Sequence, residues 1–333
     1  MSGYGLVIFI ISIAVIFDFV NGFHDAANSI ATVVATRVLS PGQAVCMAAI
    51  CNFLAAGVLG TSVAATIGRG FVNTEIVTPY VILAGLLGAI IWNLLTWFFG
   101  LPISSSHALI GGYAGAAFAK AGIHGLILGR WPSTISFIVI APILGMAFGF
   151  GLMILVYRVF ARLTPSRMDR YSRHAQLVSA ALLSGAHGTN DAQKTMGIIT
   201  ALLVAGRVQN TFVVPVWVII ISASAMGLGT LSGGWRVVKT MGTRLTRLKP
   251  RSGFAAETGA ALSILLATHL GLPVSTTHVV AGSIAGVGAI QRIRAVRWTM
   301  AANIVMAWVV TIPAAAAFAA ASFLILKLFV SAP

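Results

Sequence analysis

Two nine-residue stretches place polar side chains that could do chemistry inside otherwise apolar sequence. Residues 21–29 read NGFHDAANS, and residues 187–195 read HGTNDAQKT. Each stretch contains an acid, Asp25 or Asp191, beside amides and hydroxyl groups. An acid at the centre of a bilayer costs roughly 2.5 kcal/mol or more, so such residues normally face a protein interior or a water-filled cavity. A purely structural role is the alternative, and the occurrence of the pattern twice argues against it.

Polar residues three positions apart in each stretch would share one face of a helix and could handle a cation. Asp25 pairs in this way with Asn28, and Asp191 with Lys194. Carboxylate and amide oxygens, with the carbonyls of an unwound helix, could bind sodium at Asp25, Asn28 and Asp191, whereas the carboxylates alone could carry protons. The Lys194 ammonium would fill the cation position or pair with Asp191 or with an anion. The alternative is a lysine that extends to the external surface.

A second motif also occurs twice and could bind an anion. Residues 101–107 read LPISSSH, and residues 272–278 read LPVSTTH. In each, proline would end one helix and the hydroxyl residues would begin the next. A helix N-terminus offers free N–H groups and a positive dipole end, so two such ends could face one tetrahedral anion from opposite sides. The histidines that follow, His107 and His278, could either ligate the anion or orient the neighbouring helices.

The composition is that of a polytopic membrane protein. Of the 333 residues, 58% are hydrophobic and 8% are charged, whereas soluble domains contain roughly 25% charged residues. The mean hydropathy is +0.98, and apolar runs of about 20 residues recur, as membrane-spanning helices require. The run at 4–17 follows no basic segment and precedes no evident cleavage site, so we expect a retained helix. Cys46 and Cys51 suggest neither a disulfide framework nor a metal site.

The apolar stretches predict an all-α polytopic membrane protein with two halves. Five of them precede a basic segment and five follow it, approximately at 4–36, 42–60, 79–99, 103–121, 134–157, 177–206, 211–231, 254–270, 274–290 and 299–328. We therefore predict a first repeat at 1–157, a basic cytoplasmic linker at 158–176 and a second repeat at 177–333.

The two halves should be inverted relative to each other, because each contains an odd number of crossings. The repeated acids stand at positions 25 and 191 and the two LP motifs at 101–107 and 272–278. The offset between the halves is thus nearly the same for both motifs, which supports an internal duplication. Inverted repeats with discontinuous helices are typical of secondary transporters, whose binding sites lie near the membrane midplane. We expect such discontinuous helices, or re-entrant hairpins, at 79–121 and 254–290.

The net charge of +15 indicates a membrane orientation and not a nucleic-acid partner. With the cluster at 158–173 in the cytoplasm, the in-facing segments hold fifteen Lys and Arg residues and the out-facing segments five. This is the bias of the positive-inside rule, and attraction to anionic lipid accounts for the excess. We therefore predict a multi-pass protein of the cell inner membrane with both termini external.

Glu257 lies in the apolar stretch 254–270, and by the offset of the LP motifs the corresponding residue of the first half is Leu86. The predicted site is therefore not symmetric. A carboxylate that couples a cation and a residue near the cytoplasmic end of its helix are equally supported interpretations.

These motifs resemble those of the inorganic phosphate transporter (PiT) family, bacterial type. The family signature, G-[AG]-N-D-x-A-N-x, is similar to GFHDAANS at 22–29 and GTNDAQKT at 188–195, and the LP motifs match as well. The likeness covers nearly the whole chain. It implies a secondary active symporter of inorganic phosphate with sodium or protons, a two-repeat fold with both termini outside, no cofactor and often a homodimer.

The resemblance also implies roles for individual residues. The residues on the cation side are Asp25, Asn28, Asn190, Asp191 and Glu257. The residues on the phosphate side are Ser104, Ser105, Ser275 and Thr276. Three departures favour protons over sodium: His24 and Lys194 replace asparagines of the signature, and Asn52 stands where sodium-coupled animal members carry a glutamate.

Other functions are compatible with parts of the pattern. Another oxyanion, sulfate or arsenate, or a neutral metal–phosphate complex could be the substrate, and a passive channel is a further alternative. An intramembrane metal-dependent hydrolase could use His24 and Asp25 with His187 and Asp191. The sequence lacks the H-E-x-x-H spacing of metalloproteases, and inverted symmetry serves no purpose in hydrolysis.

Overall fold

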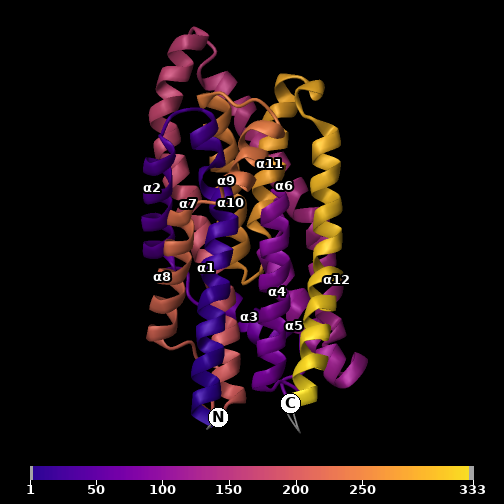
Figure 1. Ribbon diagram of the computed structural model, residues 1–333. Coiled ribbons are helices and arrows are strands. Elements are labelled where there is room, and N and C mark those ends of the chain that lie inside the picture. The colour runs from indigo at the N-terminus through magenta and orange to yellow at the C-terminus, as the bar shows by residue number, and fades with distance from the viewer. Residues whose placement is uncertain (1–2, 330–333) are drawn as a thin grey trace.

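The computed structural model describes residues 3–329, which form a bundle of helices (Figure 1). The first half contains α1 (Gly3–Ala35), α2 (Pro41–Ala55), α3 (Ser62–Gly70), α4 (Pro79–Phe99), α5 (Ser105–Ala121) and α6 (Trp131–Val159). The second half contains α7 (Pro165–Ala205), α8 (Val216–Ser232), α9 (Trp235–Lys239), α10 (Pro250–His269), α11 (Thr276–Gln291) and α12 (Trp298–Phe329). The predicted all-α fold is thus confirmed.

The order of elements in the second half matches that in the first. A long helix is followed by a helix with a short, broken extension, then by a hairpin around the LP motif, and finally by a second long helix. The final helices, α6 and α12, contain internal prolines at Pro142 and Pro313, whose separation in sequence equals that of the LP motifs. The two chain ends lie at the same end of the bundle (Figure 1). This order is consistent with two inverted repeats.

The basic segment 158–176, which we expect to link the two halves, is largely helical. Helix α6 ends at Val159 and α7 already begins at Pro165. Proline suits the first position of a helix, and Thr164 before it is extended. Met168 on the next turn is buried in the apolar core, so tertiary packing extends the helix beyond its apolar stretch.

The predicted single stretch 42–60 is broken into α2 and α3. Gly57 and Gly60 lie between them with φ angles of +81° and +80°. Residues with side chains rarely adopt this left-handed conformation, and glycine does so readily. The two glycines therefore end α2 and allow the chain to turn before α3.

Fewer helices than the ten apolar stretches could span a membrane alone. Within residues 3–329, four are long and apolar enough, at Tyr4–Ala35, Pro79–Phe99, Leu128–Val159 and Trp298–Phe329. A fifth candidate is α8 with the segment Trp235–Arg244, which bends by 62°. Helices α5 and α11 have 17 and 16 residues, and a span requires about 20. Their lengths are consistent with re-entrant hairpins.

The final helix of each half packs against the hairpin of the other half. Helix α6 contacts α10 and α11, whereas α12 contacts α4 and α5. Glycines allow the close approach, because a Cβ atom at Gly282 would collide with the carbonyl oxygen of Pro142 and one at Gly115 with that of Ala316. Small residues at such contacts are typical of membrane helices. The two halves are therefore interleaved around shared cores.

Candidate functional site

Both nine-residue motifs lie in the middle of long, uninterrupted helices. Residues 21–29 are part of α1 and residues 187–195 are part of α7, and these two helices pack against each other. The prediction that an unwound helix supplies carbonyl ligands at these motifs is therefore wrong. The backbone hydrogen bonds of the motifs stay within α1 and α7. Only the polar side chains of the motifs are available to contact other helices or an ion.

The predicted helix starts after the LP motifs are confirmed. Ser104 Oγ accepts a hydrogen bond from the backbone N–H of His107 at 3.2 Å, and Ser275 Oγ accepts one from His278 at 3.3 Å. The two serines thus cap α5 and α11. Because their oxygens are used in capping, the hydroxyl groups that meet the motif helices come from the next two positions.

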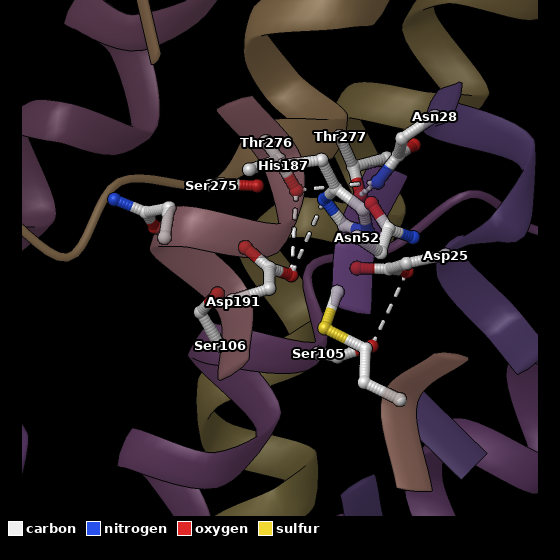
Figure 2. Close-up of polar contacts among 12 residues, drawn as sticks. Asp25, Asn28, Asn52, Ser105, Ser106, His187, Asp191, Ser275, Thr276 and Thr277 are labelled. Carbon is white, nitrogen blue, oxygen red and sulfur yellow. Dashed lines mark hydrogen bonds and ion pairs between the residues drawn. The ribbon is translucent and has the colours of Figure 1, made fainter. Parts of the chain in front are cut away.

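The residue directly after each capping serine contacts one of the two acids. Ser105 Oγ donates a hydrogen bond to Asp25 Oδ1 at 3.3 Å, and Thr276 Oγ1 donates one to Asp191 Oδ2 at 3.5 Å (Figure 2). All four side chains are buried. Each acid is therefore held at the start of the hairpin helix of its own half, in a matched arrangement.

The second residue after each capping serine, Ser106 or Thr277, links the two halves. Asn28 Nδ2 of the first half donates to Thr277 Oγ1 at 2.9 Å and to Thr276 Oγ1 at 3.2 Å. The Lys194 ammonium of the second half donates in the same way to Ser106 Oγ. Asn28 and Lys194 thus make equivalent contacts, each with the hairpin of the opposite half.

Lys194 is buried, and its Nζ lies 2.5 Å from Asp191 Oδ1. It also approaches the carbonyl oxygen of Val274 at 3.4 Å. The alternative of a lysine that extends to the surface is therefore wrong. The ammonium compensates the charge of Asp191, as one of the sequence-based interpretations proposed. His187 Nδ1 lies 3.7 Å from Asp191 Oδ2, which is too long for a hydrogen bond.

The residues before the two acids also occupy equivalent places. His24 Nδ1 lies 2.8 Å from Asp25 Oδ1, and its Nε2 lies 3.4 Å from Thr96 Oγ1. Asn190 Nδ2 donates to Thr268 Oγ1 at 2.9 Å. Sequence analysis missed both threonines. Their separation in sequence, almost equal to that of the LP motifs, is the signal that could have indicated them.

Glu257 belongs to a separate polar cluster. It is fully buried and accepts hydrogen bonds from Gln176 Nε2 at 2.8 Å and from Ser179 Oγ at 2.5 Å. Gln176 in turn accepts one from Thr36 Oγ1 at 3.0 Å. Thr36 directly follows the end of α1, about two turns beyond Asn28. The N-terminus and this cluster therefore lie on opposite sides of the two acids.

Of the oxygen atoms predicted to bind sodium, some already have hydrogen-bond partners and some do not. The two carboxylate oxygens of Asp191 contact Lys194 and Thr276. Asn28 turns its amide nitrogen toward two threonines, whereas its Oδ1 has no hydrogen-bond partner. Within residues 3–329, no group of three or more His, Cys, Asp or Glu side chains is arranged to hold a metal ion.

A cavity with a mixed polar and apolar lining leads toward the second LP motif. Its volume is about 240 Å³, and its lining includes Arg130 and Ser133 at the start of α6, Thr66 of α3 and the segment from Leu270 to Val274. The cavity therefore reaches the residue directly before the cap of α11.

Comparison with known proteins identifies close relatives. Residues 21–319 match the model of the Phosphate transporter family. The chain is 52% identical over 318 residues to a "Probable low-affinity inorganic phosphate transporter" of Rhizobium meliloti, with 95% of each chain covered. It is 44% identical over 331 residues to a protein of the same name from Bacillus subtilis, covering 97% of this chain and 98% of that one.

A solved structure has the same architecture. The protein titled "The sodium-dependent phosphate transporter" aligns with a TM-score of 0.87 and 26% sequence identity. The alignment covers 98% of this chain and the whole of the other.

Proposed function

This chain belongs to the phosphate transporter family, and from this premise we propose that it is a symporter, which uses a cation gradient to move inorganic phosphate across the cell membrane. The observation that carries the proposal is the pair of matched contacts between Ser105 and Asp25 and between Thr276 and Asp191. They bring two helix starts, which attract an anion, next to two acids, which attract a cation. Binding of the two ions is thereby linked.

We place phosphate at the starts of α5 and α11. Ser106 and Thr277 accept hydrogen bonds from Lys194 and Asn28, so each keeps its hydroxyl hydrogen for the anion. Ser105 and Thr276 donate theirs to the two acids and would have to turn toward phosphate when it binds. Ser104 and Ser275, which the resemblance also assigns to phosphate, would act by capping the helices that receive it. The relatives named as low-affinity transporters fit a site of hydroxyl and backbone donors, because such donors hold an anion less tightly than an arginine pair does.

We propose protons as the coupling ion in preference to sodium. Lys194 supplies a positive charge to Asp191 at the position that matches Asn28, so a sodium ion would have to displace an ammonium that is 2.5 Å away. The proposed coupling residues are Asp25, Asn28, Asn190, Asp191, Lys194 and Glu257. Glu257 would act at a distance, because its partner Ser179 precedes Asp191 by roughly 18 Å along α7.

The family membership favours phosphate over the other substrates compatible with the sequence. Arsenate has nearly the charge and size of phosphate, and a neutral metal–phosphate complex lacks the net charge. Sulfate carries no proton at neutral pH and cannot donate a hydrogen bond to the site, so we expect it to bind less well than phosphate. The hydrolase alternative loses its basis, because the family and the named relatives are transporters.

Uptake of phosphate into liposomes that contain the purified protein tests the proposal. We expect accumulation when a proton gradient is imposed alone, little when a sodium gradient is imposed alone, and weak competition by sulfate. Asp25→Asn should abolish accumulation because an amide cannot carry a proton. Asp169→Asn is the matched control, since Asp169 is only partly buried and pairs with Arg251 at 3.2 Å. Uptake no greater than in protein-free liposomes under both gradients would contradict transport, and accumulation driven by sodium alone would contradict proton coupling.

A further inference from the structure

Asp18 is a fully buried acid that takes part in none of the contacts described above. It lies on α1 seven residues before Asp25, roughly 10 Å closer to the N-terminal end of that helix. By the offset of the two repeated acids, the corresponding residue of the second half is Ser184, so this acid has no counterpart there. An acid buried at membrane depth is a candidate functional residue.

Five buried oxygen atoms at this position have no hydrogen-bond partner. They are the two carboxylate oxygens of Asp18, Oδ1 of Asn21, Oγ1 of Thr195 and Oγ of Ser222. The side chains of Asn21, Thr195 and Ser222 lie near enough to the Asp18 carboxylate to act on it as weak hydrogen-bond donors, although none of them makes a well-formed hydrogen bond to it. They come from α1, α7 and α8, which pack against one another. Buried polar atoms are nearly always hydrogen-bonded in folded proteins, so a cluster of five oxygens without one well-formed hydrogen bond among them requires a reason.

The charges around Asp18 do not compensate it. The charged group that acts on it most directly is another acid, Asp191 of α7, whose own charge is paired with Lys194. Helix α8 contains no titratable residue, and α4, which also packs on α1, contains only Tyr80. On α1 itself, Asp25 is paired with His24. An ionised carboxylate without a partner is costly in such a place.

We propose that Asp18 forms a second binding site for the coupling cation, separate from the centre at Asp25 and Asp191. The site takes a single positive charge, either a proton on the carboxylate or a sodium ion among the five oxygens. Hard cations select oxygen ligands, and one carboxylate matches a monovalent ion. This inference rests on the proposed symport, and it places one cation on the side of the phosphate site that faces the chain termini.

Replacement of Asp18 by asparagine separates this role from phosphate binding. In liposomes with the membrane potential clamped at zero, we expect Asp18→Asn to keep the exchange of internal for external phosphate, because the contacts of α5 and α11 are unchanged. Each coupled cation multiplies the attainable ratio of internal to external phosphate by the ratio of the cation gradient. With a tenfold gradient, the loss of one coupled cation should therefore lower the phosphate ratio by about tenfold. Asp169→Asn serves again as the control and should match the wild type in both assays.

Two arms identify the cation. With a sodium gradient, Ser222→Ala should raise the half-saturating sodium concentration if sodium uses the five oxygens. With a proton gradient, loss of accumulation in Asp18→Asn alone identifies the proton, because a proton needs only the carboxylate.

Two results would overturn the inference. One is accumulation by Asp18→Asn to the wild-type ratio under both gradients. The other is the loss of exchange together with accumulation, which would make Asp18 a structural support of the phosphate site. A wild-type protein that neither exchanges nor accumulates phosphate would instead contradict the proposed function.

Discussion

Single residues show how the site departs from symmetry. Asn28 and Lys194 occupy equivalent positions and donate to equivalent hydroxyl groups, Thr277 and Ser106. Only Lys194 adds a charge, which lies 2.5 Å from Asp191. The first half therefore holds its acid with a hydroxyl group and an imidazole, whereas the second holds its acid with a hydroxyl group and an ammonium. On the proposed mechanism, this difference leaves Asp25 as the acid that can receive a cation.

Replacement of Lys194 by asparagine should change the response of transport to cations. Lys194→Asn leaves Asp191 as an uncompensated buried carboxylate, which is costly and can be relieved by a proton or by a sodium ion. We expect most uptake at neutral pH to be lost, and the remainder to depend on sodium or to have a shifted pH optimum. The measurement is phosphate uptake into liposomes across a pH series, with sodium or choline outside.

Lys327→Asn is the control for the lysine, because Lys327 is exposed near the end of α12. Identical uptake by Lys194→Asn and the wild type in both salts would show that the ammonium has no part in coupling. A wild type that already requires sodium would show that the ammonium does not replace that ion.

The duplicated motifs identified residues that the fold brings together, but not the contacts that those residues make. Asp25 and Asp191 do contact the hydroxyl groups that follow the LP motifs. The contacts of Asn28 and Lys194 with the opposite half could not be predicted, because they depend on how distant helices cross. The cluster around Glu257 was missed for the same reason, since its partners lie on α7, far from it in sequence.

Helices α5 and α11 are held in place by glycines that face the final helix of the other half. A Cβ at Gly111 or Gly115 of α5 would collide with carbonyl groups of α12, and one at Gly282 or Gly286 of α11 with carbonyl groups of α6. The separation of the two pairs in sequence equals that of the LP motifs. The close packing fixes the helix starts, and hence the hydroxyl groups, relative to the acids.

Substitution of one such glycine should destabilise the protein more than substitution of a glycine that faces lipid. In Gly282→Val the new side chain meets the backbone at Pro142, and overpacking of this kind costs about 1–3 kcal/mol or more. In Gly151→Val, on α6, no atom lies within 4 Å of the new Cβ. We expect a clearly lower midpoint of thermal unfolding in detergent for Gly282→Val alone. Equal midpoints for the two variants would show that the contact is not tight.

Apolar runs predicted where most helices lie, whereas their ends were set by features that hydropathy does not report. Helix α7 continues to Pro165 because Met168 is buried on one face of a basic segment. The break between α2 and α3 depends on the left-handed conformation of Gly57 and Gly60. Both features are local in sequence, but only packing determines that they are used.

In the whole molecule, the two LP motifs differ in how they are covered. At both, a threonine donates to the carbonyl oxygen of the glycine before the motif, Thr240 to Gly100 at 2.9 Å and Thr66 to Gly271 at 3.1 Å. Only the first is also covered by an arginine, because Arg236 donates to the carbonyl oxygen of Phe98 at 2.5 Å. At the second, the cavity of about 240 Å³ lies between α3 and the segment 270–274. Helix α3 lies toward the end of the bundle that holds both termini, and α9 toward the other end (Figure 1). The cavity thus lies on the side of the second LP motif that faces the termini.

The orientation of the bundle is predicted by the bias of fifteen in-facing to five out-facing basic residues. In a background without Cys46 and Cys51, single cysteines in place of Arg69 and Lys327 should react with a membrane-impermeant thiol reagent in intact cells. Cysteines in place of Arg167 and Arg244 should react only after permeabilisation, because these exposed positions lie in the basic segments. A cysteine in place of Ser133 lines the cavity and should react from the same side as position 69. Labelling of positions 69 and 167 from the same side would contradict this orientation. It would also contradict the assignment of the cavity to the external side.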